Sequence, residues 1–486
     1  MHCPWAWRGQ PRARRHYGGP PLSPIVLTVE KIGGTSMTAF ADVLQNIIFH
    51  GREGQALYNR IFVVSAYANV TNWLLENKKT GAPGVYHHIT QNQEFRAALQ
   101  EVAAKLKELN THYAPLGLDL AVADAFIQQR IDQAQTYLES LTNVLASGYV
   151  NSYNILQAAR EILASIGEAH SAFNSVNILQ NRGVHATLVD LSGFDDARAL
   201  TIDERIQQAF SGIDFANTIC IATGYTKGTE GIMREFDRGY SEVTFSKIAV
   251  AVKPQEAIIH KEYHLCSADP MMVGIDHCRP VGFTNYDVAD QLADVGMEAI
   301  HPKASKPLEI NAIDLRIKNT FEPEHPGTLI TRDYVASSSH IEVITGTEKV
   351  VIIDIYDPQM VGTAGFDLHL MQAFNDLDVS YIFKATSANS ISLVIWQKDL
   401  KPQLLATLEA RYEKVTVENV ALVCLIGSNI YRAGLLAQAA GALADAGINI
   451  SSAGFALRKV NIQFVIGRDD YKNAIIALNS SFKLPS

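Results

Sequence analysis

The chain has 486 residues, more than one domain usually holds, so we expect more than one hydrophobic core. Hydrophobic residues make up 47% and charged residues 19%, which is typical of a globular protein and excludes a disordered or fibrous one. The net charge is −9, and no apolar run approaches the ~20 residues of a membrane span, so we expect neither a nucleic-acid partner nor a membrane location.

The first 24 residues differ in composition from the rest of the chain. They hold four arginines and five prolines but no acidic residue. An arginine-rich, acid-poor start is typical of a transit peptide, but these prolines would break the amphipathic helix of such a peptide. We therefore expect a disordered basic extension over residues 1–24, or a start site assigned too far upstream. The five cysteines lie far apart without CxxC spacing, which favours a reducing cytoplasm.

After this extension, short apolar runs alternate with amphipathic stretches. Residues 155–166 carry apolar side chains at helical spacing. Strands that alternate with helices indicate an α/β fold with a largely parallel sheet. Strands are expected at residues 25–29, 61–64, 186–189, 218–222 and 248–252.

A repeat appears after about Arg332, where the expected elements become shorter. Gly365 and Gly434 each open a helix, and Val379 and Ile448 each follow one, with the same offset of 69 residues between the members of each pair. Two copies of a βαββα unit explain a fixed offset of this kind. We expect domain boundaries at 25–332, 333–412 and 413–486, and the last elements of the second unit can pack back into the first.

The stretch Lys31-Ile-Gly-Gly-Thr-Ser36 directly follows the first expected strand. Gly33 and Gly34 let the backbone approach a phosphate closely, and Lys31 adds a mobile positive charge suited to a phosphoryl group. The stretch is not a Walker loop, because GxxxxGK[ST] is absent. Taken alone, it is equally well explained as a glycine turn with a hydroxyl side chain capping the next helix.

Polar side chains also follow the second expected strand. Ser65 and Thr71 would lie at its carboxyl end, where open α/β sheets bind ligands, although an ordinary loop is the alternative. Further along, Glu168 could hold a substrate ammonium group. Ser165 and Glu168 also satisfy the S-x-x-E pattern of a capping box, so the structural interpretation is a helix start.

A fourth polar cluster is Asp237-Arg-Gly-Tyr-Ser-Glu242. An arginine beside a glycine and a serine suits bidentate capture of a carboxylate. Glu242 could orient lysines or a metal-bound phosphate, whereas a solvated surface acid is the plain alternative.

Taken in order, these clusters resemble the aspartate kinases, and the match covers nearly everything after the extension. The similar family motifs are K-F-G-G-T-S, V-S-A-x4-T-N, G-E, G-R-G-G-S-D and G-A-K-V-L-H-P, at residues 31–36, 64–72, 167–168, 237–242 and 296–302. The repeat resembles the paired ACT modules of that family. The resemblance implies an open, mostly parallel sheet with helices on both faces, followed by two βαββα ferredoxin-like ACT modules.

The same resemblance implies a function and a set of site residues. The expected reaction is phosphorylation of the side-chain carboxylate of L-aspartate by ATP, a first step toward lysine, threonine, methionine or ectoine, with Mg²⁺ carried by ATP and no protein-held metal. Lys31 and Glu242 are the expected catalytic residues. Substrate binding is expected from Ser65, Thr71, Glu168, Arg238, Gly239 and Ser241, and ATP binding from Lys31, Gly33, Gly34, Ser36, Lys261, Asp269 and Lys303.

Several positions depart from the family pattern. Tyr240 stands at the second glycine of G-R-G-G-S-D, and Glu242 stands at its aspartate. Lys261 replaces an aspartate of the nucleotide segment, and Glu298 replaces the lysine of G-A-K-V-L-H-P, for which Lys303 is a possible substitute. Variants of this kind resemble the aspartate kinases associated with ectoine synthesis.

The paired modules imply a cytoplasmic homodimer that forms through them and binds an amino-acid effector. The candidate effector residues lie near the first helix start of the first module: Met360, Gly362, Ala364, Gly365 and Phe366. Modules that only dimerise are the alternative.

Two rival functions and one rival site remain. A kinase for glutamate or N-acetylglutamate would lack the paired modules, and a non-catalytic amino-acid sensor would have lost its ATP site. His260 and His264 are spaced for one helix face and lie near Cys266 and Cys278, but this set fits no common zinc spacing. A nucleotide-side loop with incidental histidines is favoured.

Overall fold

The computed structural model describes residues 26–77, 80–297, 299–455 and 458–482, and for Arg238 it describes the backbone but not the side chain. The expected extension over 1–24 and the variant position Glu298 lie outside these residues. Within the described part of the chain, no helix combines the length and the apolar character needed to cross a bilayer.

The first sheet contains eight strands within the described residues, in the order β3-β4-β2-β1-β5-β7-β8-β6. All neighbouring pairs in this sheet are parallel except β7 with β8. The strands are β1 (Thr28–Ile32), β2 (Arg60–Val64), β3 (Ala186–Val189), β4 (Ile219–Thr223), β5 (Glu256–Lys261), β6 (Phe283–Asn285), β7 (Leu315–Asn319) and β8 (Thr328–Thr331).

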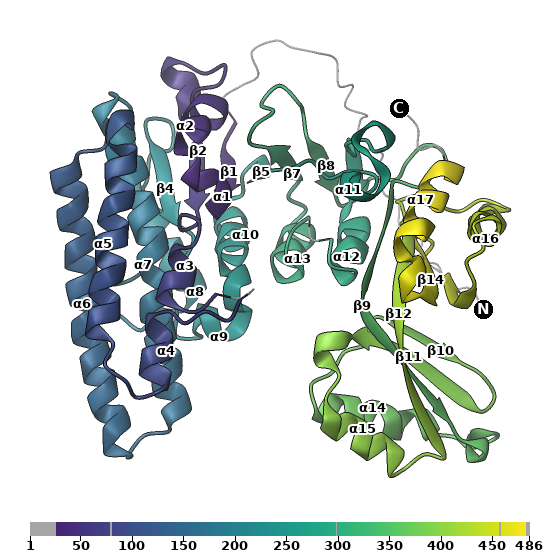
Figure 1. Cartoon of the computed structure of the whole chain (residues 1–486). Helices are drawn as coiled ribbons and strands as arrows, with labels where there is room; N and C mark the ends of the chain where they lie inside the picture. The colour runs from purple at the N-terminus through teal and green to yellow at the C-terminus, as the bar shows by residue number, and fades with distance from the viewer. Residues whose placement is uncertain (1–25, 78–79, 298, 456–457, 483–486) are drawn as a thin grey trace, which may run out of the picture.

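Every residue of β2 and β4 is buried, whichever face of the sheet its side chain points to. Both faces of the sheet are therefore covered, and helices provide the cover. The long helices α5, α6 and α7 stand beside one end of the sheet (Figure 1). The helices of this region are α1 (Gly34–Thr38), α2 (Phe40–Asp42), α3 (Val70–Leu74), α4 (Val85–Thr90), α5 (Arg96–Tyr113), α6 (Leu120–Ser147), α7 (Ser152–Asn181), α8 (Ile202–Phe210), α9 (Ile232–Phe236), α10 (Tyr240–Val252), α11 (Pro270–Val273), α12 (Tyr286–Asp294) and α13 (Pro302–Ile310).

Four of the five expected strands are present, with shifted ends for β1, and the fifth is wrong. Residues 248–252 form the last turns of α10, and the neighbouring strand is β5, which begins at Glu256. The apolar run misled the sequence analysis because α10 is deeply buried, and a short apolar run suits a buried helix as well as a buried strand.

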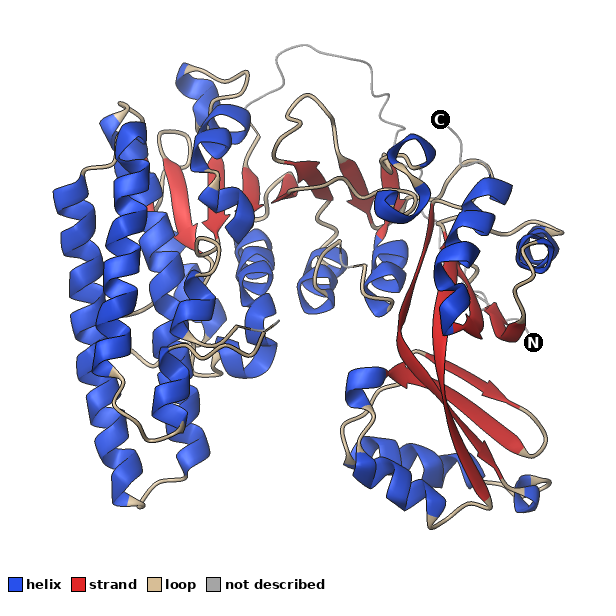
Figure 2. Cartoon of the chain, in the orientation of Figure 1, coloured by secondary structure: helices blue, strands red, loops and turns tan. Residues whose placement is uncertain are grey.

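The second sheet is antiparallel, with the strand order β10-β11-β9-β12-β14-β13 (Figure 2). It carries helices α14 and α15 beside one half and α16 and α17 beside the other. The elements are β9 (Val343–Tyr356), α14 (Phe366–Asp376), β10 (Phe383–Thr386), β11 (Ser390–Trp396), α15 (Pro402–Glu409), β12 (Lys414–Ile426), α16 (Leu435–Asp445), β13 (Ile450–Phe455), β14 (Asn461–Gly467) and α17 (Tyr471–Phe482).

The repeat seen in the sequence is confirmed by these elements. Gly365 and Gly434 are the N-caps of α14 and α16, with φ of 80° and 81°, a left-handed conformation that glycine adopts without strain. The strands β9 and β12 pair along almost their whole length. One half of each long strand packs into the core of the first unit and the other half into the core of the second.

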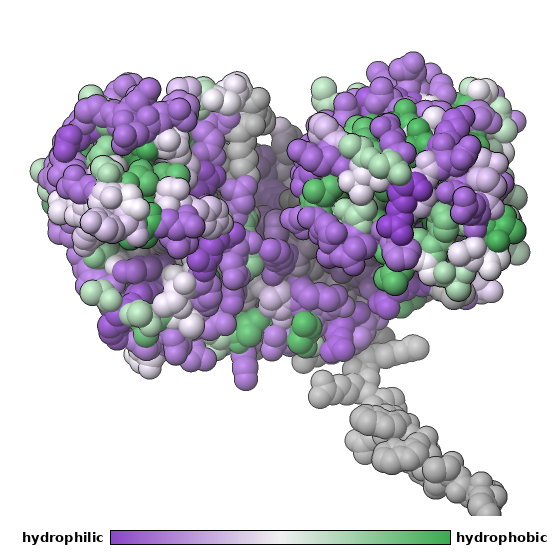
Figure 3. Space-filling model, turned by 90° about the horizontal axis from the view of Figure 1, so that it is seen from below, coloured by the Kyte–Doolittle hydropathy of each residue, from purple (hydrophilic) through white to green (hydrophobic). Residues whose placement is uncertain are grey.

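The paired units contact the first region through α12 and the strands near it. Asn461 of β14 donates to Gln291 of α12 over 2.8 Å, and Thr284 of β6 donates to Glu342, just before β9, over 2.6 Å. Figure 3 shows a mostly hydrophilic surface with a hollow between the two masses of the molecule. The second sheet is thus joined to the first along one side.

Candidate functional site

The loops that follow β1 and β2 pack against each other with almost no space between their backbones. The amide of Ser65 donates to the carbonyl of Ile32 over 3.1 Å. A Cβ added at Gly34 would lie 2.7 Å from the carbonyl oxygen of Ala66, which is closer than real Cβ atoms approach. Gly34 therefore lets the segment after Lys31 lie directly on the loop that follows Ser65.

Glu168 reaches the same place from α7. A Cβ at Gly167 would lie 2.6 Å from the Cβ of Ala66, so this helix packs directly on the loop after β2, and Ser171 donates to the carbonyl of Ser65 over 2.8 Å. The capping-box interpretation of Ser165 and Glu168 is wrong, since both lie in the middle of α7. Ser165 donates its hydroxyl back to the carbonyl of Ile162 within the helix over 2.6 Å, and neither residue caps a helix start.

Glu168 is 2% exposed, and the two oxygens of its carboxylate have different surroundings. Tyr240 donates its hydroxyl to Oε1 over 2.7 Å, and Ser241 donates to the same oxygen over 3.4 Å. Oε2 makes no hydrogen bond with the residues that the structure describes. Burial raises the pKa of Glu168 to about 7, although the bonds from Tyr240 and Ser241 lower it in part.

Glu242, two residues after Tyr240 on α10, faces two lysines. Its carboxylate lies 3.7 Å from the ammonium of Lys31, and it accepts the amide of His301 over 2.6 Å. Burial alone would raise the pKa of Glu242, but the charges of Lys31 and Lys261 hold it below its ordinary value. Of the two alternatives for Glu242, the structure thus shows a carboxylate that contacts a lysine of the glycine loop.

Glu262 is a neighbour of this cluster that the sequence analysis missed. Its Oε1 accepts from both the amide and the hydroxyl of Ser36, over 3.2 and 3.1 Å, and Ser36 also lies 3.0 Å from the hydroxyl of Thr320. Ser36 is thereby fixed between β1, β5 and β7. Only the register of these strands brings the three residues together, so no sequence motif could have indicated it.

A buried ion network lies beneath the glycine loop and was also missed. Arg60 of β2 donates to both oxygens of Glu30 over 2.7 and 3.0 Å, and His260 lies 2.8 Å from Oε2 of Glu30. Burial would raise the pKa of Glu30, but Arg60 and His260 hold it well below its ordinary value. The network ties β1, β2 and β5 together next to Lys31.

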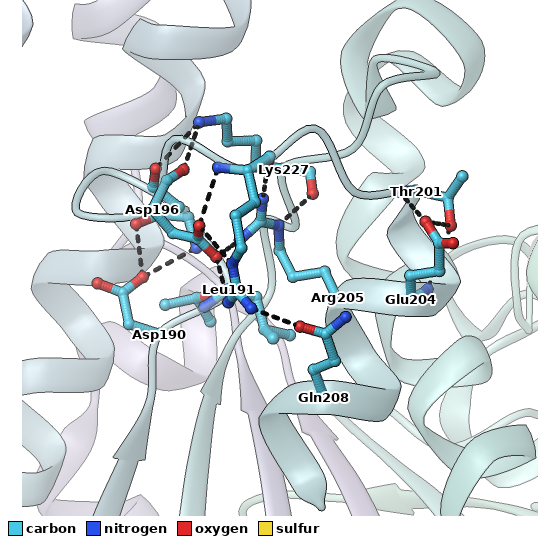
Figure 4. A network of polar contacts seen from close by, with 12 residues as sticks. Asp190, Leu191, Asp196, Thr201, Glu204, Arg205, Gln208 and Lys227 are labelled. Carbon is cyan, nitrogen blue, oxygen red and sulfur yellow. Dashed lines mark hydrogen bonds and ion pairs between the residues drawn. The ribbon is translucent and has the colours of Figure 1, made fainter.

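The loops after β3 and β4 are fixed by a polar network (Figure 4). Arg205 of α8 donates to the carbonyl of Lys227 over 2.7 Å and to Asp196 over 2.9 Å. The ammonium of Lys227 donates to the carbonyls of Gly193 and Asp196, over 3.1 and 2.9 Å. This network sets the path of the chain just after Gly224, whose amide donates to Val64 at the end of β2.

Some expected site residues lie at the edge of this cluster or away from it. Thr71 is half-buried in α3, near Ser65, and Lys303 donates its ammonium to the carbonyl of Glu235 over 2.9 Å. Asp269 caps α11, where it accepts from the amide of Met271 over 2.8 Å. The expected effector residues lie in the segment that leads from β9 to the first residue of α14: Met360, Gly362, Ala364, Gly365 and Phe366.

Gly239 packs closely, since a Cβ there would lie 2.8 Å from the ring of His301. The preceding side chain, that of Arg238, is outside the described part of the structure, so its expected role stays a prediction.

The histidines and cysteines near β5 take other partners. His260 lies on the strand and His264 in the loop after it, so the two histidines do not share a helix face. His264 lies 3.0 Å from Glu322. Among the described residues, no three His, Cys, Asp or Glu side chains are grouped so as to hold a metal ion.

The cluster therefore combines a lysine, a glycine-lined loop and a buried carboxylate with a free oxygen, at the carboxyl ends of parallel strands where α/β sheets bind ligands. A mobile ammonium beside a glycine loop suits an anionic phosphoryl group, and an unpaired buried carboxylate oxygen suits an ammonium group.

Comparison with known proteins places these features in a family context. Residues 26–319 match the model of the amino acid kinase family. The chain is 46% identical over 464 residues to the aspartate kinase Ask_Ect of Stutzerimonas stutzeri, an alignment that covers 94% of this chain and 98% of that protein. It is 26% identical to the chloroplastic aspartokinase 1 of Arabidopsis thaliana, over 94% of this chain and 80% of that protein.

Solved structures share the fold. The aspartate kinase of Clostridium acetobutylicum superposes with a TM-score of 0.70 at 20% identity, over 94% of this chain and 100% of that one. Escherichia coli aspartokinase III in complex with aspartate and ADP gives a TM-score of 0.67 at 18% identity, over 94% and 99% of the two chains.

Proposed function

The chain belongs to the aspartate kinases, a branch of the amino acid kinase family, and we propose that it transfers the γ-phosphoryl group of ATP to the side-chain carboxylate of L-aspartate. The product is 4-phospho-L-aspartate. The resemblance drawn from the sequence motifs is confirmed by the family match.

The observation that carries the assignment to this site is the first turn of α10. Three consecutive residues there connect the two expected halves of the site: Tyr240 and Ser241 donate to Glu168, and Glu242 contacts Lys31. An amino acid whose ammonium meets Glu168 would thus have its other end on the side of Lys31. The two reactants would then meet beside this turn.

The chemistry that follows needs no general base, because the acceptor carboxylate is already ionised at pH 7. The barrier is the repulsion between that carboxylate and the triphosphate, so catalysis rests on positioning and charge neutralisation. Lys31 contacts the transferring phosphoryl group, supported by the amides of Gly33 and Gly34. Glu168 takes the substrate ammonium, Arg238 its α-carboxylate, and Ser65 and Thr71 its reacting end.

The nucleotide side extends from the glycine loop toward β5. Ser36, Lys261, Asp269 and Lys303 are the remaining residues assigned to ATP, and Gly239 and Ser241 complete the substrate side. Magnesium carried by ATP would neutralise phosphate charge. Glu242 and Glu262, which contact Lys31 and Ser36, would face it with oxygen atoms of the kind that this ion prefers.

The paired units are proposed as ACT modules that form a cytoplasmic homodimer and bind an amino-acid effector near Gly365. A signal from them has a physical route, because Asn461 and Glu342 bond directly to α12 and β6 of the kinase region. Regulation requires that the effector bind two states with different affinity. Service of an ectoine pathway is proposed on the resemblance to that subgroup.

The function is tested by trapping the acyl phosphate with hydroxylamine. We expect hydroxamate only when both ATP and L-aspartate are present, and little with L-glutamate or N-acetyl-L-glutamate as acceptor. Addition of lysine, threonine or ectoine in turn tests the effector. A protein that binds ATP or amino acids but makes no hydroxamate from any acceptor would instead support the sensor alternative.

A further inference from the structure

The two oxygens of the Glu168 carboxylate are engaged differently in the folded protein. Oε1 accepts the hydroxyl of Tyr240 over 2.7 Å and that of Ser241 over 3.4 Å. Oε2 is buried and has no hydrogen-bond partner among the described residues. A buried polar atom without a partner is costly, so its persistence points to a ligand that completes it.

The position of the Tyr240 hydroxyl is fixed by packing. Tyr240 is the first residue of α10 and is 2% exposed. Its ring meets the ring of Tyr225 edge-on, with 5.9 Å between centroids. Tyr225 in turn donates its hydroxyl to Glu161 over 2.7 Å, and Glu161 also accepts the amide of Met233 over 2.8 Å.

Two tyrosines in contact therefore hold two glutamates of one helix. Glu161 and Glu168 are seven residues apart on α7, a spacing that places them on the same helix face. The family motif that residues 237–242 resemble has glycine at the position of Tyr240, and glycine could neither donate this bond nor contact Tyr225. The bond thus depends on the side chain that departs from this motif.

We propose that Tyr240 is the specificity-determining residue of the acceptor site: its hydroxyl occupies Oε1 of Glu168 and leaves Oε2 as the acceptor for the ammonium of an amino-acid substrate. This inference rests on the proposed function of the site. A substrate without an ammonium group would leave the buried carboxylate unpaired, so the site rejects it. Without the hydroxyl of Tyr240, Oε1 keeps only the longer bond from Ser241. The charged form of the carboxyl is then less stabilised, so the carboxyl holds its proton more tightly and attracts an ammonium group less.

The test compares Tyr240→Phe with Tyr225→Phe. Each removes one hydroxyl bond to a glutamate of α7 and keeps the aromatic ring, so the second is a matched control. Initial rates of hydroxamate formation are measured with L-aspartate and with succinate, which is the same dicarboxylate without the ammonium group. ATP dependence is measured in parallel, and thermal unfolding shows whether each variant is folded.

For Tyr240→Phe we expect KM for L-aspartate to rise by roughly ten- to a hundredfold, the effect of one hydrogen bond to a charged buried group. Preference for L-aspartate over succinate should shrink by a similar factor, while KM for ATP stays within about twofold. Tyr225→Phe should leave KM for L-aspartate within about threefold. In a double-mutant cycle, Tyr240→Phe and Glu168→Gln should be non-additive, because both act on one carboxylate.

An unchanged KM for L-aspartate and unchanged preference in Tyr240→Phe would overturn the inference, as would a lower KM or additivity in the cycle. If Tyr240→Phe and Tyr225→Phe changed KM for L-aspartate equally, Tyr240 would have only a packing role, and the inference would be overturned as well. These results all require a wild type that phosphorylates L-aspartate. A wild type that forms no hydroxamate would instead overturn the proposed function, and this inference with it.

Discussion

The ammonium of Lys31 lies 3.7 Å from the carboxylate of Glu242, and both side chains are largely shielded, with 12% and 15% of their surfaces exposed. Lys31 is the fourth of the five residues of β1, and Glu242 belongs to the first turn of α10. The pair joins the strand that leads into the glycine loop to helix α10. The two residues before Glu242 in this helix, Tyr240 and Ser241, contact Glu168. The ammonium of Lys31 is therefore already oriented by Glu242 before a phosphoryl group binds.

Substitution Glu168→Gln should have opposite effects on stability and on substrate binding. Burial raises the pKa of Glu168 to about 7, so at pH values between its ordinary value and 7 the folded protein keeps a proton that the unfolded chain has lost. Folding stability therefore falls as pH rises through this window, and the cost remains above it. A neutral glutamine avoids that cost.

We expect Glu168→Gln to raise the unfolding free energy at pH 8 by on the order of 1–3 kcal/mol relative to wild type, and to change it little at pH 5. Its KM for L-aspartate should rise strongly at both pH values. Melting curves at the two pH values measure the change in stability, and initial rates measure the change in KM. Destabilisation by the same amount at pH 5 and pH 8 would show that the charge of Glu168 is not the cause.

Substitution Arg60→Met should destabilise the protein strongly. It leaves Glu30, which is 1% exposed, without its bidentate partner, and it removes donors to the carbonyls of Ile47 and Ile48. Removing one member of a buried ion pair typically costs about 3–5 kcal/mol. Urea unfolding measures the loss.

Arg316→Met is the matched control, because Arg316 also makes a two-nitrogen contact to one glutamate, Glu256, but with 24% of each side chain exposed. A more exposed pair should contribute no more than about 1 kcal/mol. Losses of equal size in the two variants would contradict the importance given to burial.

Substitution Gly34→Ala should damage the site by displacing the glycine loop. The added Cβ would lie 2.7 Å from a backbone oxygen of Ala66, which cannot rotate away as a side chain would. A displacement of the loop by about 1 Å can cost roughly a hundredfold in kcat. Gly441→Ala, where the added Cβ meets no atom within 4 Å in helix α16, should leave kcat unchanged and stabilise by about 0.5–1 kcal/mol. Equal activity of the two variants would refute the close approach at Gly34.

The sequence was most informative where structure depends on neighbouring residues. Buried strands such as β2 and β4 are short apolar runs between breakers. The glycines Gly365 and Gly434 mark helix starts because glycine readily adopts a left-handed backbone conformation. The error at residues 248–252 has the same origin, because a local apolar run does not say whether a buried element is a helix or a strand.

Contacts between residues far apart in the chain could not be predicted from the sequence. Lys31 and Glu168 were singled out from motifs, but Glu262 and Thr320 reach Ser36 only through the register of β5 and β7. Tyr240 was noted only as a departure from a family pattern. Its hydroxyl bond to Glu168 depends on how α10 packs on α7, which no short stretch of sequence specifies.

The most direct test is the rate of acyl phosphate formation by Lys31→Ala, measured as hydroxamate at saturating ATP and L-aspartate. Lys247→Ala is the control, because Lys247 lies on α10 like Glu242 but pairs with Asp203 at the surface over 2.7 Å. We expect Lys31→Ala to lower kcat by roughly a hundred- to a thousandfold with little change in KM for L-aspartate, and Lys247→Ala to behave as wild type. A Lys31→Ala protein that works near the wild-type rate would contradict the account.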